Sequence, residues 1–255
     1  METTSVIKYI SNWLLKYSNS SNSNGFVVGV SGGIDSALTS TLAAKTGLPL
    51  ICIEMPIYQN KKQVKRGITH IEWLKHSFPN VKSIKLDLTK VLEEFTKNIP
   101  ENNNQLALAN TRARLRMTTL YYFAQINNCL VLGTGNKVED FGIGFFTKYG
   151  DGGVDISPIA DLLKSEVYAL SESLNINPSI LNAPPTDGLW ESNKTDEDQI
   201  GASYPELEWA MQYRENDKEL SKREKKVLKI YTQLNNKNQH KMRKIPICKI
   251  PKHLK

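Results

Sequence analysis

The chain has 255 residues, of which 40% are hydrophobic and 23% charged, and these values are ordinary for a globular protein. The length allows one large α/β domain with a sizeable core, so we expect a single domain over residues 1–255, with a core of about 1–215 and a basic C-terminal helix and tail over about 216–255. No apolar run approaches the roughly 20 residues that cross a membrane. The N-terminus lacks the pattern of a secretion signal.

The net charge of +7 is concentrated at the C-terminus, where residues 216–255 carry 13 Lys or Arg against 3 Asp or Glu. A basic segment of this kind suits an anionic partner such as a nucleotide or RNA, although a solvated basic helix explains the charge equally well. Cys52, Cys129 and Cys248 form no C-x-x-C pair. We therefore expect reduced thiols in a cytoplasmic protein rather than a disulfide or zinc framework.

Hydrophobic periodicity predicts strands that alternate with helices along the chain. The expected strands are 26–30, 48–56, 81–88 and a fourth that with its exit loop spans 129–136. The expected helices are about 3–17, 36–46, 60–77, 88–98, 105–127, 161–174, 203–214 and 218–234. Residues 139–155 are rich in glycine and are expected to form a loop. This alternation predicts an α/β fold with a doubly wound parallel sheet flanked by helices. In such sheets ligands bind beyond the carboxyl ends of the strands, so the loops after the first and fourth strands are expected to meet there.

The loop after the first strand reads S-G-G-I-D-S over residues 31–36. Gly32 and Gly33 let the backbone approach an anion closely, and Ser31 and Ser36 carry hydroxyls that can donate to it. The Lys of a P-loop NTPase motif is missing. Asp35 beside phosphates requires a cation, and Mg²⁺ prefers one or two carboxylates plus phosphate oxygens. The loop therefore predicts a site that splits ATP into AMP and pyrophosphate, whereas the simpler alternative is a tight turn with a capping side chain.

Three further stretches carry candidate residues. N-T-R-A-R-L-R-M over 110–117 places Arg112 and Arg116 on one helix face and Arg114 with Asn110 on another. These arginines suit phosphate, but on their own they read as surface residues of an amphipathic helix.

The other two stretches follow the fourth strand. V-L-G-T-G-N-K-V-E over 131–139 puts Thr134 at the end of that strand and Glu139 shortly after it, as a second candidate Mg²⁺ ligand. F-T-K-Y-G-D-G-G-V-D over 146–155 offers Lys148 to a phosphate and Asp155 to a ribose or amide. The alternatives are a capping threonine with a solvated glutamate, and a polar turn.

S-G-G-x-D-S resembles the signature of the PP-loop ATP pyrophosphatases. The stretches SGGIDSAL, NTRARLRM, VLGTGN, FFTKYGDGG, PPTDGL and the Asp-Glu, Ile-Gly and Tyr positions up to Tyr204 resemble, in order and spacing, the ammonia-dependent NAD synthetase family. The resemblance runs from about Val27 to Tyr204 and resumes at His240 and Lys241. It implies a Rossmann-like sheet of the adenine nucleotide α-hydrolase type.

The resemblance also implies roles for individual residues. ATP would be bound by Gly29, Val30, Ser31, Gly32, Gly33, Ile34, Asp35, Ser36, Thr134, Lys164 and Thr186. Mg²⁺ would be held by Asp35 and Glu139, and Ser31, Asp35 and Lys164 would be the catalytic residues. Deamido-NAD would be bound by Arg114, Lys148, Asp155, His240 and Lys241. Two departures affect this assignment: the segment 140–146 is one residue longer than in some relatives, and the charged segment 215–238 is long.

The implied reaction amidates nicotinic acid adenine dinucleotide with ammonia to give NAD⁺, through an acyl-adenylate and with release of AMP and pyrophosphate. The chain has no cysteine in the context of a glutaminase, so free ammonia is the expected nitrogen donor. A homodimer is implied, and the polar segment 186–199 is the expected lid over the site. Two alternatives stay open: a tRNA-modifying PP-loop enzyme that uses the basic tail, and a sensor that binds ATP without cleaving it.

Overall fold

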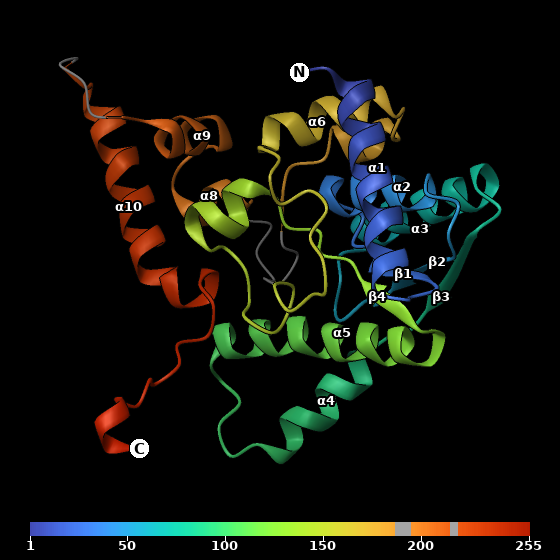
Figure 1. Cartoon of the computed structure of the whole chain (residues 1–255), viewed down its shortest axis with the longest axis horizontal. Coiled ribbons are helices and arrows are strands. Elements are labelled where there is room, and N and C mark those ends of the chain that lie inside the picture. The colour runs from blue at the N-terminus through green and yellow to red at the C-terminus, as the bar shows by residue number, and fades with distance from the viewer. Residues whose placement is uncertain (187–194, 215–218) are drawn as a thin grey trace.

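The computed structural model describes residues 1–186, 195–214 and 219–255. Its centre is a sheet of four parallel strands in the order β3-β2-β1-β4, shown in Figure 1. The strands are β1 Gly25–Gly29, β2 Leu50–Glu54, β3 Val81–Lys85 and β4 Cys129–Val131. The expected doubly wound parallel sheet is thus confirmed, and β1 lies inside it between β2 and β4.

The two inner strands, β1 and β2, are buried on both faces and are almost continuously apolar, whereas the edge strand β3 is largely exposed. Phe26 pairs with Leu50 and Val28 with Cys52, and all four side chains are buried. Period-two alternation sends Val28 and Cys52 to one face, and it sends Val27 and Ile53 to the other.

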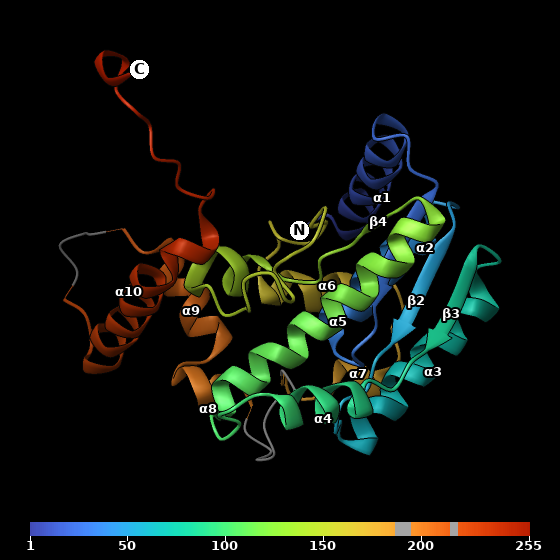
Figure 2. The same cartoon turned by 90° about the horizontal axis from the view of Figure 1, so that it is seen from below.

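Helices cover each face of the sheet, as Figure 2 shows. The face of Val28 packs against α1 Thr3–Ser20, α2 Ile34–Ala44, α3 Lys61–Ser77, α6 Lys164–Ser173 and α7 Pro178–Leu181. The face of Val27 packs against α4 Thr89–Asn98 and α5 Gln105–Asn127.

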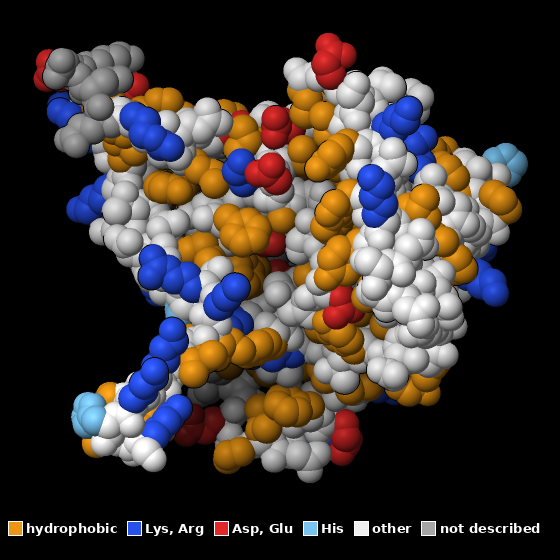
Figure 3. All heavy atoms as spheres, viewed as in Figure 1, with side chains coloured by type: hydrophobic (Ala, Val, Ile, Leu, Met, Phe, Trp, Pro, Cys, Tyr) orange, Lys and Arg blue, Asp and Glu red, His pale blue; other side chains and the backbone are white. Residues whose placement is uncertain are grey.

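A third group of helices lies beside the sheet and has its own apolar cluster (Figure 1). It comprises the π-helix η1 Val138–Ile143, α8 Asp196–Ile200, α9 Tyr204–Gln212 and α10 Lys222–Met242. Leu207 and Val227 are fully or almost fully buried in it. The short 3₁₀-helix η2 Lys252–Leu254 ends an exposed tail that leaves the body after α10. Figure 3 shows Lys and Arg side chains along this tail, at the lower left of the view.

Several predicted boundaries are wrong. The expected loop at 139–155 begins with η1, a π-helix that includes the first five positions of the predicted loop. The last expected helix, 218–234, is displaced and runs over 222–242, starting at a capping box in which Ser221 and Glu224 satisfy each other's backbone N–H groups. The predicted fourth strand and exit loop over 129–136 divide at residue 131, where β4 ends, and Gly133 N–H in the exit loop donates to the carbonyl of Ile156.

The expected lid segment 186–199 includes residues 187–194, which lie outside the described residues. Its last residues are not a loop, because α8 starts at Asp196 behind the capping residue Thr195. No helix in the described ranges is long and apolar enough to cross a bilayer.

Candidate active site

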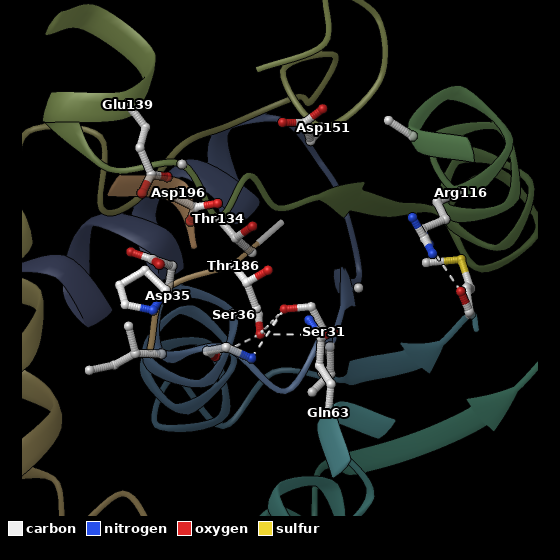
Figure 4. Close-up of a pocket in the computed structure, with 18 of the residues that line it drawn as sticks. Ser31, Asp35, Ser36, Gln63, Arg116, Thr134, Glu139, Asp151, Thr186 and Asp196 are labelled. Atoms are coloured by element: carbon white, nitrogen blue, oxygen red, sulfur yellow. Dashed lines mark hydrogen bonds between the residues drawn. The ribbon is translucent and has the colours of Figure 1, made fainter. Parts of the chain in front are cut away.

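A cavity of about 280 Å³ opens at the carboxyl ends of β1, β2 and β4, where the fold predicts ligand binding. All the residues expected at the ATP site line it except Gly32. Figure 4 shows Asp35 and Glu139 at one side of this cavity and Arg116 at the other. The structure therefore brings together the two loops that the sequence predicts to meet.

The S-G-G-I-D-S loop is shaped by a glycine and tied by its serines. Gly32 has φ +81°, and a Cβ there would lie 2.3 Å from the carbonyl oxygen of Gln63 on α3, so both the conformation and the space demand glycine. Ser31 Oγ lies 3.1 Å from Ser36 Oγ, and Gly33 N–H donates to Ser31 Oγ at 3.2 Å. Both hydroxyls face the cavity beside the start of α2.

The first turn of α2 is well suited to an anion. Gly33 is its N-cap and offers no side chain, so among the described residues no side-chain oxygen caps the helix. The first N–H groups of a helix need acceptors, and together with the helix dipole they favour negative charge. The alternative of a tight turn with a capping side chain is met in part, because serine hydroxyls accept from the N–H groups of Ser31 and Gly33, while the N-cap residue itself offers no side chain.

Three charged side chains meet at the other side of the cavity. Lys164 Nζ lies 2.6 Å from Asp35 Oδ2 and 3.1 Å from Glu139 Oε1. Asn136 Nδ2 donates to Asp35 Oδ1 at 3.1 Å, and the hydroxyl of Tyr204 donates to Glu139 Oε1 at 2.5 Å. α2, η1 and α6 thus each contribute one charge, and α9 contributes the phenol that supports it.

This arrangement keeps the lysine charged and one carboxylate ionised. Burial disfavours the ammonium of Lys164, but the attraction of Asp35 and Glu139 is greater, so the pKa of Lys164 lies above its ordinary value. Burial also disfavours the Glu139 carboxylate, but Lys164 and the bond from Tyr204 outweigh it and lower its pKa. For Asp35 burial dominates, and the pKa is raised.

Two further carboxylates line the cavity. Burial, with the nearby charges of Glu139 and Asp151, raises the pKa of Asp140 to about 8. Burial also raises the pKa of Asp151, which accepts from the N–H of Thr147 at 3.0 Å. The carboxyl of Asp140 lies against Gly135, where a Cβ would overlap it at 2.2 Å.

Two of the five residues expected to bind deamido-NAD, Lys148 and Lys241, line a second cavity. The guanidinium of Arg114 donates to the carbonyl of Lys148, and Lys148 Nζ donates to the carbonyl of His240 at 2.6 Å. Asp155 accepts from the hydroxyl of Tyr121 at 3.0 Å and from the N–H of Val131 at 2.8 Å. Hydrogen bonds therefore connect three of the five residues, Arg114, Lys148 and His240. Lys241 follows His240 in the chain and donates to the carbonyl of Phe146, and Asp155 is bound separately, to Tyr121 and Val131.

The arginines of α5 divide between two environments. The expected core stripe of Ala109, Ala113, Met117 and Leu120 is buried, and Arg114 is exposed. Arg112 is only 9% exposed, and Arg116 donates to the carbonyl of Met55 at 3.0 Å and to Gln59 Oε1 at 2.7 Å. The reading of these two as surface arginines is wrong, since their side chains lie inside the fold.

Some residues of the site do not stand out in the sequence reasoning. Asp196 and Tyr204 lie in the stretch that carries the family resemblance, but no role was predicted for either residue. Glu54, at the end of the second strand, is marked by no pattern. Asn136 had a usable signal, because it follows the fourth strand by a few residues and its amide matches the carboxylate of Asp35.

Comparison with known proteins gives a consistent result. The family model "NAD synthase" matches residues 6–246. The chain is 37% identical over 238 residues to the NH(3)-dependent NAD(+) synthetase of Carboxydothermus hydrogenoformans, covering 91% of this chain and 92% of the relative. It is 35% identical to the NH(3)-dependent NAD(+) synthetase of Syntrophomonas wolfei over 100% of both chains.

Solved structures agree with these matches. The NMN synthetase of Francisella tularensis superposes with a TM-score of 0.86 and 33% identity, covering 99% of both chains. The NH3-dependent NAD synthetase of Campylobacter jejuni superposes with a TM-score of 0.78 and 27% identity, covering 98% of this chain and 100% of that one. These findings favour the predicted family over the tRNA-modifying alternative. The chain belongs to the NAD synthase family.

Proposed function

We propose that the protein uses ATP to amidate nicotinic acid adenine dinucleotide with free ammonia, giving NAD⁺, AMP and pyrophosphate, and that it acts as one domain over residues 1–255 in a cytoplasmic homodimer. The observation that carries the proposal is that the S-G-G-I-D-S loop and the trio Asp35, Glu139 and Lys164 line one cavity. The names of the relatives from Carboxydothermus and Syntrophomonas support it.

The loop would hold the phosphates of ATP. The open first turn of α2 supplies N–H donors, and Ser31 and Ser36 add hydroxyls. Such donors stabilise the negative charge that develops when pyrophosphate leaves. Lys164 would add a positive charge at the same side of the cavity, and no residue needs to act as a covalent nucleophile.

The donor set fits Mg²⁺. Asp35 and Glu139 converge on a single cation in this structure, the ammonium of Lys164, at 2.6 and 3.1 Å. Two carboxylates beside a phosphate-binding loop are what Mg²⁺ takes from proteins. Bound there, it would neutralise charge on the leaving pyrophosphate. The residues of this chain bind and orient: Asn136 and Tyr204 hold the two carboxylates in place.

The second cavity would hold the dinucleotide. Arg114, Lys148 and Lys241 bring positive charge to it, and Arg114 is exposed and ready for a phosphate. The exposed faces of Tyr122 and Ile126 on α5, 63% and 60% exposed, support a subunit interface along that helix.

The test measures NAD⁺ and AMP together in a reaction with ATP, Mg²⁺, an ammonium salt and nicotinic acid adenine dinucleotide. Equal yields of NAD⁺ and AMP are expected, and both should be lost in Asp35→Ala. Asp161→Asn is the matched control, because the side chain of Asp161 is 96% exposed. Binding of ATP without cleavage would instead support the sensor alternative, and AMP without NAD⁺ would show that another molecule accepts the adenylate.

One observation favours a second candidate substrate for the amidation. The Francisella relative, an NMN synthetase, matches this chain over 99% of both lengths. Amidation of nicotinic acid mononucleotide is the same chemistry on a smaller substrate. The two acceptors should be supplied together at equal concentration, and the product in excess, NAD⁺ or nicotinamide mononucleotide, identifies the preferred one.

A further inference from the structure

Glu54 is a buried carboxylate in the cavity whose oxygens accept no hydrogen bond from the described residues. It is the last residue of β2, is 6% exposed, and lines the same cavity as the S-G-G-I-D-S loop. Its Oε1 is shielded from water and has no hydrogen-bond partner. Leaving a buried acceptor unpaired is unfavourable, so a ligand that brings a hydrogen-bond donor to this position would be stabilised.

The one charged neighbour of Glu54 within the described residues is Lys85, and it does not fill this need. Glu54 and Lys85 are register partners on β2 and β3, and Lys85 Nζ lies 3.6 Å from Glu54 Oε1. That separation is too long for a hydrogen bond. The side chain of Lys85 is 66% exposed, and such solvated pairs contribute little to stability.

The position of Glu54 relative to the loop suggests which donor it meets. The N–H of Val30 donates to the carbonyl of Ile53 at 3.0 Å, so Glu54 lies one strand away from Ser31, a spacing of about 4.8 Å. In Rossmann-like sites an acidic residue about 20 residues after the glycines, at the end of the second strand, accepts from a ribose hydroxyl. Here Gly33 opens α2 and Glu54 ends the next strand.

We propose that Glu54 is a specificity residue that accepts a hydrogen bond from the adenosine half of ATP, either from a ribose hydroxyl or from the adenine amino group. This inference rests on the proposed function in one respect, that ATP occupies the cavity. A nucleotide whose phosphates lie on the loop at the start of α2 places its adenosine beside the end of β2. A carboxylate there stabilises a nucleotide that presents a hydrogen-bond donor at this point. It destabilises one that presents a hydrogen-bond acceptor.

The test is equilibrium binding of nucleotides by calorimetry with Mg²⁺ present and with no ammonia or second substrate. The wild type, Glu54→Gln and Lys85→Met are each titrated with ATP, 2′-deoxy-ATP, 3′-deoxy-ATP and purine riboside triphosphate, which lacks the adenine amino group. Glu54→Gln keeps the shape of the side chain and removes its charge. Lys85→Met removes the ion pair and leaves the carboxylate.

We expect Glu54→Gln to bind ATP about 10- to 100-fold more weakly than the wild type, as for the loss of one charge-assisted hydrogen bond. Lys85→Met should bind ATP within about twofold of the wild type. One analogue should bind equally to the wild type and to Glu54→Gln, and the group that this analogue lacks identifies the donor as ribose or adenine.

Three results would overturn the inference: Glu54→Gln binding ATP like the wild type, an equal loss for all four nucleotides, or the same loss in Lys85→Met. The titrations of the wild type are a test that does not depend on how the variants fold. If the inference holds, the wild type binds at least one analogue more weakly than it binds ATP. If the wild type binds no ATP at all, both the proposed function and this inference are wrong. The three results above would contradict this inference alone and would not contradict the proposed function.

Discussion

Lys164 Nζ lies 2.6 Å from Asp35 Oδ2, although the two residues are 129 positions apart in the chain. The side chain of Lys164 is 4% exposed and that of Asp35 is 18% exposed, so the pair is shielded from water. Breaking a buried pair by removing one partner leaves an uncompensated charge, which is strongly destabilising.

Lys164→Met should therefore lower the free energy of unfolding by about 3 kcal/mol, because Asp35 and Glu139 would face each other without their cation. Thermal unfolding followed by circular dichroism measures the effect. Lys137→Met is the matched control, since Lys137 pairs with the exposed Asp161 at 2.8 Å and should change stability by less than about 1 kcal/mol. Equal losses in the two variants would contradict the assignment.

Tyr204→Phe should reduce NAD⁺ formation by about tenfold and raise the Mg²⁺ concentration needed for half-maximal rate, because Glu139 loses the phenol that orients it. Rates are measured across a Mg²⁺ titration. Tyr9→Phe serves for comparison, as Tyr9 is 72% exposed on α1. An unchanged Mg²⁺ dependence in Tyr204→Phe would argue against a metal at Glu139.

Gly32→Ala should destabilise the protein more than Gly47→Ala. Both glycines have positive φ, +81° and +77°, so both substitutions incur the left-handed penalty of about 1–2 kcal/mol. A Cβ at Gly47 meets nothing within 4 Å, whereas at Gly32 it overlaps the carbonyl of Gln63. Denaturant titration gives the difference, and similar midpoints for the two variants would show that the loop relaxes freely.

Acidification should destabilise the fold through His70. The ring is 1% exposed, its Nε2 lies 3.0 Å from Ser40 Oγ, and burial lowers its pKa to about 4 from an ordinary value of 6.5. Between these values the unfolded chain binds the proton and the folded chain does not, so stability falls as the pH drops from 6.5 to 4. The loss at the lower end is on the order of 3 kcal/mol.

His70→Gln should flatten this acid limb of the stability curve while keeping a polar partner for the hydroxyl of Ser40. Urea unfolding at pH 4, 5, 6 and 7 measures it. His76→Gln, on the exposed side of α3, should reproduce the wild-type slope. A slope unchanged by His70→Gln would show that other groups set the acid response.

The sequence predicts well those elements whose type and position depend on their own residues. The apolar runs of β1 and β2 and the core stripe of α5 lie where periodicity puts them, because burial selects those side chains directly. The extent of α10 was missed because Val227 is its one buried residue, so its start depends on the capping box at Ser221 rather than on an apolar pattern.

The residues of the site also fall into those that a local motif predicts and those that depend on distant contacts. The S-G-G-I-D-S loop lies at the end of β1, and the start of α2 there is left without a side-chain cap, so a local motif is enough to place it. The bond between Tyr204 and Glu139 joins residues 65 positions apart, and it depends on how α9 packs against η1. Glu54 was missed because a single acidic residue at the end of an apolar strand resembles an ordinary solvated strand end. It becomes notable only when the structure shows that its Oε1 is buried and has no hydrogen-bond partner.

The strand order has a consequence for synthesis on the ribosome. β1 is complete by residue 29, and β2 covers one of its edges by residue 54, but the other edge waits for β4 at residues 129–131. At about 5–20 residues per second, roughly 100 residues of translation leave that apolar edge open for on the order of 5–20 s. An open strand edge is a template for pairing with other chains. The nascent protein is thus most prone to aggregate before β4 emerges, and chaperones that bind extended apolar segments have their target in that interval.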